Sequence, residues 1–288
     1  MWNPFNRNTI SNSSASKRSL QLITQKGMPF AYVEAYKALR TNLNFLSGSG
    51  DVHAFVVTST VPEEAKSNVS VNLALALTES GKKVVLVDCD LRKPVLHRYL
   101  KAGHNLKGVS NVLSRQVALS DALVELKGIP NLTFLPAGTT PPNPSELLSQ
   151  PQMQEMVDTL RGSYDFVILD APPISMVTDA AVIGRIVDGA LFVVRSKYAS
   201  TDAVKTALEK LQDAGVKVLG AVLTRYDAKK SLKRSDYGYG YYYYNSNYSY
   251  GTPPPDGISE SAAEKSCLTS KNRHNGKEKH SVHTEDET

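Results

Sequence analysis

Short, continuously apolar segments alternate with longer helix-like segments along most of the chain, and this alternation restricts the fold more than any other feature. Apolar runs of this length are typical of strands buried on both faces, and the helices between them form the crossovers of a parallel sheet. We therefore predict an α/β fold in which a mostly parallel sheet is flanked by helices. The predicted strands are Ala54–Ser59, Val84–Val87, Leu132–Leu135, Phe166–Leu169, Ala190–Val194 and Val216–Leu223, and the predicted helices are Tyr32–Phe45, Ser67–Ser80, Ser145–Leu160 and Thr201–Ala214.

The alternating pattern is confined to residues 30–227, which we predict to form one domain. Residues 1–29 are rich in Asn, Ser, Lys and Arg and lack periodicity, so we predict a flexible basic N-terminal segment. Residues 228–288 offer no apolar face and are predicted to form a disordered tail. The tail contains the sequence DYGYGYYYYNSNYSYG, whose tyrosine cluster at 237–250 holds more than half of the chain's 14 tyrosines.

The composition argues against several classes of protein. Two cysteines in 288 residues are too few for a disulfide framework, so a reducing cytosol is the expected location. No apolar run approaches the roughly 18 residues that a membrane-spanning helix needs. Basic and acidic side chains are equally numerous in the predicted domain, which argues against a nucleic-acid partner. The basic N-terminal segment is either a solvated tail or a contact for anionic lipid, and the sequence leaves both open.

A lysine and a hydroxyl residue begin the helix that follows the first predicted strand. Lys66 and Ser67 stand where P-loop proteins hold phosphate. In such loops backbone N–H groups and the helix N-terminus attract the anion, the lysine adds positive charge and the hydroxyl ligates Mg²⁺. The usual glycines are absent, because Thr60 and Ala65 occupy their positions. The pair alone is therefore a weak signal, and its meaning depends on acids elsewhere in the chain.

Three acidic residues stand at the ends of predicted strands. Asp88 and Asp90 follow the second strand, and Asp170 follows FVIL. Each alone is typical of a turn that ends a strand. Ligands of open α/β sheets lie beyond the carboxyl ends of the strands, so we expect these acids to converge with Lys66 and Ser67. The combination favours a site for Mg²⁺ and a nucleotide.

These motifs resemble those of the bacterial tyrosine kinases of the capsule and exopolysaccharide type, P-loop proteins related to the Min and Par partition ATPases. VVLVDCDLR resembles the family's acidic second Walker motif, YDFVILDAPP its Walker B strand, and GTTPPNPSELL a segment that precedes Walker B. EAYKALRTN is similar to the oligomerisation helix, with Glu34 and Arg40 in place and Lys37 replacing an arginine. The tyrosine-rich tail is similar to the family's autophosphorylation cluster.

The resemblance implies an ATP-dependent protein-tyrosine autokinase that regulates capsular or exopolysaccharide biosynthesis and export. It implies catalysis by Lys66, Asp88, Asp90 and Asp170, with Mg²⁺ held by Ser67, Asp88 and Asp170. The expected contacts to ATP are Pro62, Glu64, Ala65, Lys66, Ser67, Asn68, Arg92 and Thr224. The expected phosphoacceptors, modified in trans, are Tyr237, Tyr239, Tyr241, Tyr242, Tyr243, Tyr244, Tyr248 and Tyr250.

Partners and location follow from the same resemblance. It implies a ring-shaped homo-oligomer built partly on the helix that carries Glu34, Lys37 and Arg40. It also implies a membrane polysaccharide co-polymerase whose cytosolic segment activates the kinase, and a tyrosine phosphatase. The chain is expected in the cytoplasm, recruited to the inner face of the cell membrane by its partner.

The phosphate loop departs from the family pattern Pro-Gly-Glu-Gly-Lys-Ser/Thr. Glu63 and Ala65 replace glycines, and Thr224 stands where relatives commonly have Asn near the adenine. Glycine adopts a positive φ without strain, whereas Ala65 at a positive φ would be strained by about 1 kcal/mol. Two alternatives to an active kinase stay open: a pseudokinase scaffold with weakened ATP binding, and a partition-type ATPase. Arg92 is expected either to stabilise phosphate charge or to pair with an acid.

Overall fold

The computed structural model describes residues 21–48, 52–103 and 105–226. All of them lie within one compact unit. The tyrosine cluster at 237–250, the rest of the predicted tail and residues 1–20 of the predicted N-terminal segment fall outside the described residues.

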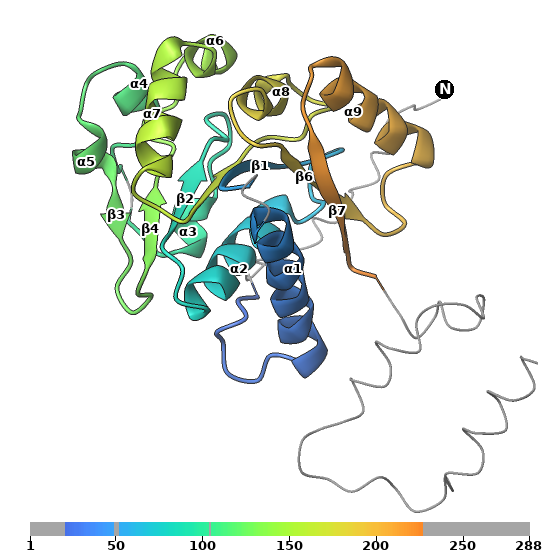
Figure 1. The fold of residues 1–288 in the computed structure, drawn as a ribbon. Helices are drawn as coiled ribbons and strands as arrows, with labels where there is room; N and C mark the ends of the chain where they lie inside the picture. The colour runs from blue at the N-terminus through green and yellow to red at the C-terminus, as the bar shows by residue number, and fades with distance from the viewer. Residues whose placement is uncertain (1–20, 49–51, 104, 227–288) are drawn as a thin grey trace, which may run out of the picture. The chain divides into compact units, whose positions relative to one another are not determined.

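A seven-stranded sheet forms the centre of the domain, in the order β3-β4-β2-β5-β1-β6-β7 (Figure 1). Every neighbouring pair is parallel except β3 and β4, which are antiparallel at one edge. The predicted α/β fold with a mostly parallel sheet is therefore confirmed. The strands are β1 (Ala54–Ser59), β2 (Val84–Asp88), β3 (Val124–Glu125), β4 (Leu132–Leu135), β5 (Phe166–Asp170), β6 (Ala190–Arg195) and β7 (Val218–Thr224).

Helices cover both faces of the sheet, and each face has its own apolar core (Figure 1). Successive residues of a strand point to opposite faces, so Phe55 packs on one side and Val56 on the other. The first face carries α1 (Phe30–Gly48), α2 (Lys66–Glu79) and α3 (Leu96–Tyr99). The second carries α4 (Val109–Leu113), α5 (Leu119–Ala122), α6 (Pro144–Leu148), α7 (Pro151–Arg161), α8 (Asp179–Gly184) and α9 (Thr201–Asp213).

The prediction of one continuous helix in the second half of the domain is wrong. The segment predicted as a single helix from Ser145 to Leu160 is two helices, α6 and α7, which meet at Ser149 and Gln150. Pro151 explains the break, because proline lacks an N–H and forces the preceding residue out of the helical region. Gln150 accordingly has φ −73° and ψ 152°.

The folded domain extends N-terminal of the predicted boundary at residue 30. The backbone N–H of Ile23 donates a hydrogen bond to Oδ1 of Asn72 on α2, at 2.8 Å, and the Ile23 side chain is buried. Residues just before α1 therefore pack on the helix that follows the phosphate loop. Among the described residues, no helix is both long and apolar enough to span a membrane.

Candidate nucleotide-binding and phosphotransfer site

The loop between β1 and α2 holds two residues in the left-handed backbone conformation. Glu63 has φ 69° and Ala65 has φ 71°. These are the two positions at which the family pattern has glycine, so the loop keeps a glycine-like path without glycine. The strain predicted for Ala65 at a positive φ is present, and Glu63 adds a second strained residue. Each costs roughly 1 kcal/mol relative to glycine.

Glu64, between the two strained residues, is almost fully buried, with an exposed fraction of 1%. Its Oε2 accepts the backbone N–H of Val61 at 2.9 Å, and its Oε1 accepts the backbone N–H of Arg195 at 3.1 Å. The Glu64 carbonyl accepts the hydroxyl of Thr224 at 2.9 Å. The loop is therefore fixed to itself and to the ends of β6 and β7. Strained residues persist only where surrounding contacts determine their conformation in this way.

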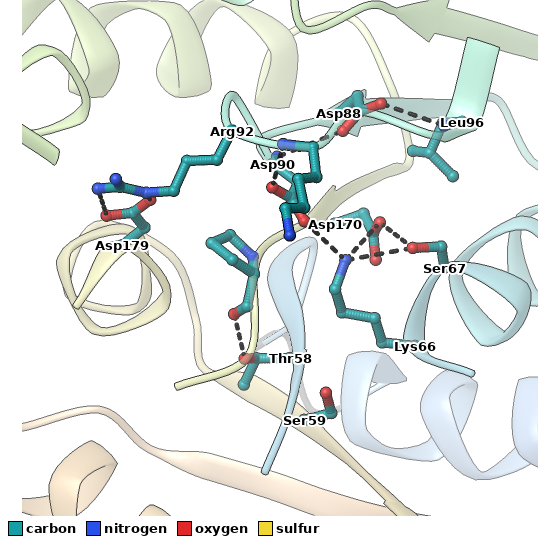
Figure 2. Close-up of polar contacts among 12 residues, drawn as sticks. Thr58, Ser59, Lys66, Ser67, Asp88, Asp90, Arg92, Leu96, Asp170 and Asp179 are labelled. Atoms are coloured by element: carbon teal, nitrogen blue, oxygen red, sulfur yellow. Dashed lines mark hydrogen bonds and ion pairs between the residues drawn. The ribbon is translucent and has the colours of Figure 1, made fainter. Parts of the chain in front are cut away.

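Lys66, at the first position of α2, lies at the centre of a cluster of acids (Figure 2). Its Nζ is 3.1 Å from Oδ2 of Asp170, 3.5 Å from Oδ2 of Asp90 and 3.2 Å from Oγ of Ser67. Burial alone would lower the pKa of Lys66, but Asp170 and then Asp90 outweigh it and the pKa is raised. The lysine is therefore held positively charged inside the site.

Asp170, at the end of β5, has no exposed side-chain surface and receives two hydroxyl groups from α2. Ser67 donates to Oδ2 at 2.6 Å and Ser70 donates to Oδ1 at 2.9 Å. Ser70 was not among the predicted site residues. Its position one turn after Ser67 places it on the same side of the helix, which is the signal that could have identified it.

Asp88, at the end of β2, is fully buried and held by backbone groups. Its Oδ2 accepts the N–H of Leu96 at 3.2 Å, and its Oδ1 accepts the N–H of Asp90 at 3.3 Å. Burial raises the pKa of Asp88 to about 8, with a further contribution from Asp170, while Lys66 acts in the opposite direction. Asp88 is thus a much stronger base than an ordinary carboxylate.

We expect Asp88 to make the metal-free protein less stable as the pH rises. An aspartate in an unfolded chain has a pKa of about 3.9, whereas that of folded Asp88 is about 8. Between these values the folded state keeps a proton that the unfolded state has lost. The free energy of unfolding therefore falls by up to ~1.4 kcal/mol per pH unit.

Urea unfolding in EDTA between about pH 5 and pH 8 measures this dependence on either side of neutrality. The Asp88→Asn variant should show a flatter profile, because it has no proton to retain. If the free energy of unfolding fell equally with pH in wild type and in Asp88→Asn, groups other than Asp88 would be responsible for the pH dependence.

Arg92 pairs with an acid, which is one of the two alternatives that the sequence left open. Its Nε donates to Oδ2 of the fully buried Asp179 at 3.1 Å, and its Nη2 donates to Oγ of Ser145 at 2.8 Å. Ser145 also donates to Asp179. Figure 2 shows the Arg92 side chain directed toward Asp179 and away from Lys66. Asp179 and Ser145 were not predicted, because their approach to Arg92 depends on how α6 and α8 pack.

Two further predicted nucleotide contacts are Pro62 and Asn68, and the Asn68 side chain is engaged with another helix. Pro62 is exposed. Oδ1 of Asn68 accepts the hydroxyls of Tyr32 and Tyr36 on α1, each at 3.0 Å, so its amide group faces that helix. Contact between ATP and either residue stays a prediction.

The predicted oligomerisation residues lie on α1 and have partners within this chain. Nζ of Lys37 is 2.7 Å from Oε1 of Glu34, both on the same helix. Nη1 of Arg40 donates to the carbonyl of Ala76 on α2 at 2.9 Å. The Arg40 contact joins α1 to the helix that begins with Lys66, while the role of the three residues in assembly stays a prediction.

The residues at this site fit a bound Mg²⁺–nucleotide. Among the described residues, no group of three or more His, Cys, Asp and Glu side chains is placed to hold a metal ion alone. Mg²⁺ at phosphate sites normally takes only one or two protein carboxylates and completes its shell with phosphate oxygens and water. The Ser67 hydroxyl and the Asp170 carboxylate, 2.6 Å apart, supply hard oxygen ligands of this kind.

Comparisons with known proteins agree with this geometry. A family model described as an AAA domain matches residues 64–218. Tyrosine-protein kinase YwqD of Bacillus subtilis (strain 168) is 37% identical over 205 residues, which cover 71% of this chain and 84% of that protein. The crystal structure of the chimerical protein CapA2B2 has 35% sequence identity and a TM-score of 0.67, covering 72% of this chain and 90% of the other.

A more distant likeness concerns the fold alone. The septum site-determining protein MinD from Pyrococcus horikoshii OT3, solved in complex with Mg-ADP, has 24% identity and a TM-score of 0.53. It covers 65% of this chain and 79% of the other. The arrangement of strands and helices in this domain is therefore similar to that of the MinD structure.

Proposed function

This chain belongs to the bacterial tyrosine-kinase family of P-loop proteins, and we propose that it is an ATP-dependent protein-tyrosine autokinase. The observation that carries the proposal is the position of Lys66. Its Nζ lies within 3.5 Å of Asp90 and Asp170 at the start of the helix that follows the phosphate loop. A buried cation beside a hydroxyl and carboxylates suits phosphoryl transfer, in which the protein mainly positions groups and neutralises charge.

Each residue of the cluster has a distinct role in this proposal. Mg²⁺–ATP, when bound, supplies the γ-phosphoryl group and part of the charge neutralisation. Lys66 holds the β- and γ-phosphates, while Ser67 and Asp170 hold the metal ion. The tyrosine oxygen forms a bond to the γ-phosphorus, and the bond between that phosphorus and the β–γ bridging oxygen breaks. Asp88 takes the proton of the tyrosine hydroxyl in the same step. With a pKa of about 8, Asp88 is a strong proton acceptor in its ionised form, so this step requires Asp88 to have lost the proton that it keeps at lower pH. Asp90 keeps Lys66 in place through their contact at 3.5 Å.

The tyrosine cluster at 237–250 is the proposed substrate, modified in trans. Its glycines and repeated tyrosines allow different hydroxyls to enter one site. Each phosphate adds about −1.5 to −2 charge, so several phosphates on one tail repel neighbouring tails in an oligomer. We propose that this repulsion opens a ring-shaped assembly, and that a tyrosine phosphatase reverses the change.

The proposed setting is capsular or exopolysaccharide biosynthesis and export. A membrane polysaccharide co-polymerase recruits the kinase to the inner face of the membrane, and its cytosolic segment activates it. Relatives named tyrosine-protein kinase support the catalytic part of this proposal. The partner, the phosphatase and the polysaccharide role rest on the family resemblance of the motifs.

A pseudokinase scaffold is the second candidate, favoured by the two strained residues of the phosphate loop. Ala65 lacks the freedom of glycine at φ 71°, and Glu63 places an acidic residue in a loop that must approach phosphate. In that case the chain would be phosphorylated by another kinase and would bind ATP weakly. Nucleotide titration separates the two candidates.

Phosphotyrosine mass spectrometry of the purified full chain with Mg²⁺–ATP tests the kinase proposal. We expect phosphate on the 237–250 cluster, with more of it when the partner's cytosolic peptide is present. A variant with all eight tyrosines of the cluster changed to Phe should lose this signal while it keeps nucleotide binding. No phosphotyrosine on the folded wild-type chain, with peptide and ATP present, would favour the scaffold.

A further inference from the structure

We propose that Thr224 and Glu64 are positioning residues that keep a glycine-free phosphate loop in its phosphate-binding conformation. The inference deepens the proposed function, because it concerns the loop that would hold the nucleotide. It explains how the loop keeps its shape after the loss of two glycines. It also assigns Thr224 a role that differs from the adenine contact implied by the family resemblance.

The need for such a device follows from the backbone of the loop. Glu63 and Ala65 both occupy the left-handed region, with φ 69° and 71°. Residues other than glycine are strained in this region, so without further contacts the loop would relax to another backbone conformation. A relaxed loop would not present its N–H groups to an anion. Some contact must therefore oppose the relaxation of both residues.

Glu64 is the one residue between the two strained positions, and it is fixed from three directions. Its carboxylate accepts backbone N–H groups from Val61 at 2.9 Å and from Arg195 at 3.1 Å. Its own carbonyl accepts the Thr224 hydroxyl at 2.9 Å. With both the side chain and the carbonyl of Glu64 held, neither neighbouring residue can turn freely.

The two anchors outside the loop stand side by side in the sheet. Arg195 ends β6, Thr224 ends β7, and the two residues are direct partners in the parallel register of these strands. A second contact from Arg195 reaches the loop, because its Nη1 donates to the carbonyl of Glu63 at 3.4 Å. The end of a rigid strand pair therefore serves as the fixed base for the loop.

The Thr224 hydroxyl has its one proton committed to this function. A threonine hydroxyl donates one hydrogen bond, and here the better acceptor is the Glu64 carbonyl at 2.9 Å, with the Val194 carbonyl at 3.5 Å. In this geometry Thr224 has no donor left for a nucleotide. Its influence on binding would pass through the loop.

A double-mutant comparison tests the proposal in the full chain. The hydroxyl is removed by Thr224→Val in two backgrounds, the native loop and a loop carrying Glu63→Gly and Ala65→Gly. The measured quantities are the affinity for Mg²⁺–ATP and the urea midpoint of the nucleotide-free protein. Thr224→Ser, which keeps the hydroxyl, is the conservative control and should retain wild-type affinity.

We expect Thr224→Val to weaken Mg²⁺–ATP binding about fivefold in the native loop but less than about twofold in the glycine loop. The urea midpoint should show the opposite order. In the native loop the loss of the hydroxyl is partly offset by relief of strain, whereas the glycine loop has no strain to relieve. The shift in midpoint should therefore be larger in the glycine background. A larger loss of affinity in the native loop together with a larger loss of stability in the glycine loop is specific to such a clamp, meaning the contacts of Thr224 and Glu64 that hold the strained loop.

Equal effects of Thr224→Val in both backgrounds, for affinity and midpoint alike, would overturn the proposal. That result would make the hydroxyl either a direct nucleotide contact or a local structural bond. If Thr224→Val does not fold in the native loop, Glu64→Gln replaces it in the same comparison. If no variant binds Mg²⁺–ATP, the proposed function fails, while the order of the urea midpoints still decides whether the clamp exists.

Discussion

Replacing Lys66 by methionine is expected to reduce phosphorylation of the tyrosine cluster by at least ~100-fold, the usual cost of removing one strong electrostatic contact to the transition state. The structural reason is that Nζ of Lys66 lies 3.1 Å from Asp170 and 3.5 Å from Asp90. Methionine keeps the length of the side chain but supplies no charge for the phosphates. Binding of ATP should weaken both with Mg²⁺ and in EDTA, because in the proposed mechanism the lysine contacts phosphate directly and not through the metal ion.

The same substitution should also destabilise the folded protein in a way that depends on pH. Without Lys66 the three buried acids have lost their cation, and breaking a buried ion pair typically costs about 3 kcal/mol or more. Asp88 already has a pKa of about 8, and loss of the lysine would raise it further, so proton uptake relieves part of the repulsion. Relative to wild type, the variant should therefore be more destabilised at about pH 8 than at about pH 6.

Lys82→Met is the matched control, since Lys82 is an exposed lysine in the turn after α2. It should leave phosphorylation, ATP affinity and the pH profile of stability unchanged. Activity assays of Lys66→Met are best made at the lowest pH at which wild type works, after circular dichroism has shown that the variant is folded. Wild-type phosphorylation by folded Lys66→Met would contradict the proposed site.

The centre of the sheet was predictable from the sequence because β1, β2 and β5 are buried at every position, whereas the two-residue edge strand β3 was not predicted. A run such as FVIL is apolar at every position, and the observed strand, Phe166–Asp170, differs from the prediction only at its end. The short helices were not predictable, because α3 and α5 have four residues each and α4 has five. One turn of helix is too short to show an apolar period. The break between α6 and α7 had a readable signal in Pro151.

Some residues of the candidate site were likewise predictable from the sequence, and others were not. Lys66, Asp88 and Asp170 stand at the ends of parallel strands or at the start of the following helix, so their approach follows from the topology alone. The pairing of Arg92 with Asp179 does not, because Asp179 belongs to a short helix reached through a loop after β5. Glu64 was predicted to contact the nucleotide, but its burial and three anchors required the positions of β6 and β7.

Replacing Asp170 by asparagine is expected to make ATP affinity independent of Mg²⁺ while the fold is kept. Asp170 Oδ2 accepts Ser67 and Lys66, and an asparagine carbonyl can accept both. The amide NH₂ would then face Ser70, whose hydroxyl can accept it and still donate to the Lys66 carbonyl, now 3.1 Å away. Lys66 loses its pair with Asp170 but keeps Asp90 at 3.5 Å, and the acid cluster carries one negative charge less. The variant should therefore be destabilised less than Lys66→Met, with a urea midpoint closer to wild type.

The expected functional loss is at least ~100-fold in phosphorylation, because a neutral amide is a poor ligand for Mg²⁺ and cannot balance its charge. ATP affinity measured with Mg²⁺ should fall to the value that wild type shows in EDTA, and EDTA should have no further effect. Asp213→Asn, at an exposed acid at the end of α9, should behave as wild type. If Asp170→Asn retained Mg²⁺-stimulated ATP binding, Asp88 or Asp90 and not Asp170 would be assigned as the ligand of the metal ion. Because Lys66→Met should lose affinity in both conditions, the two variants together separate the phosphate contact from the metal contact.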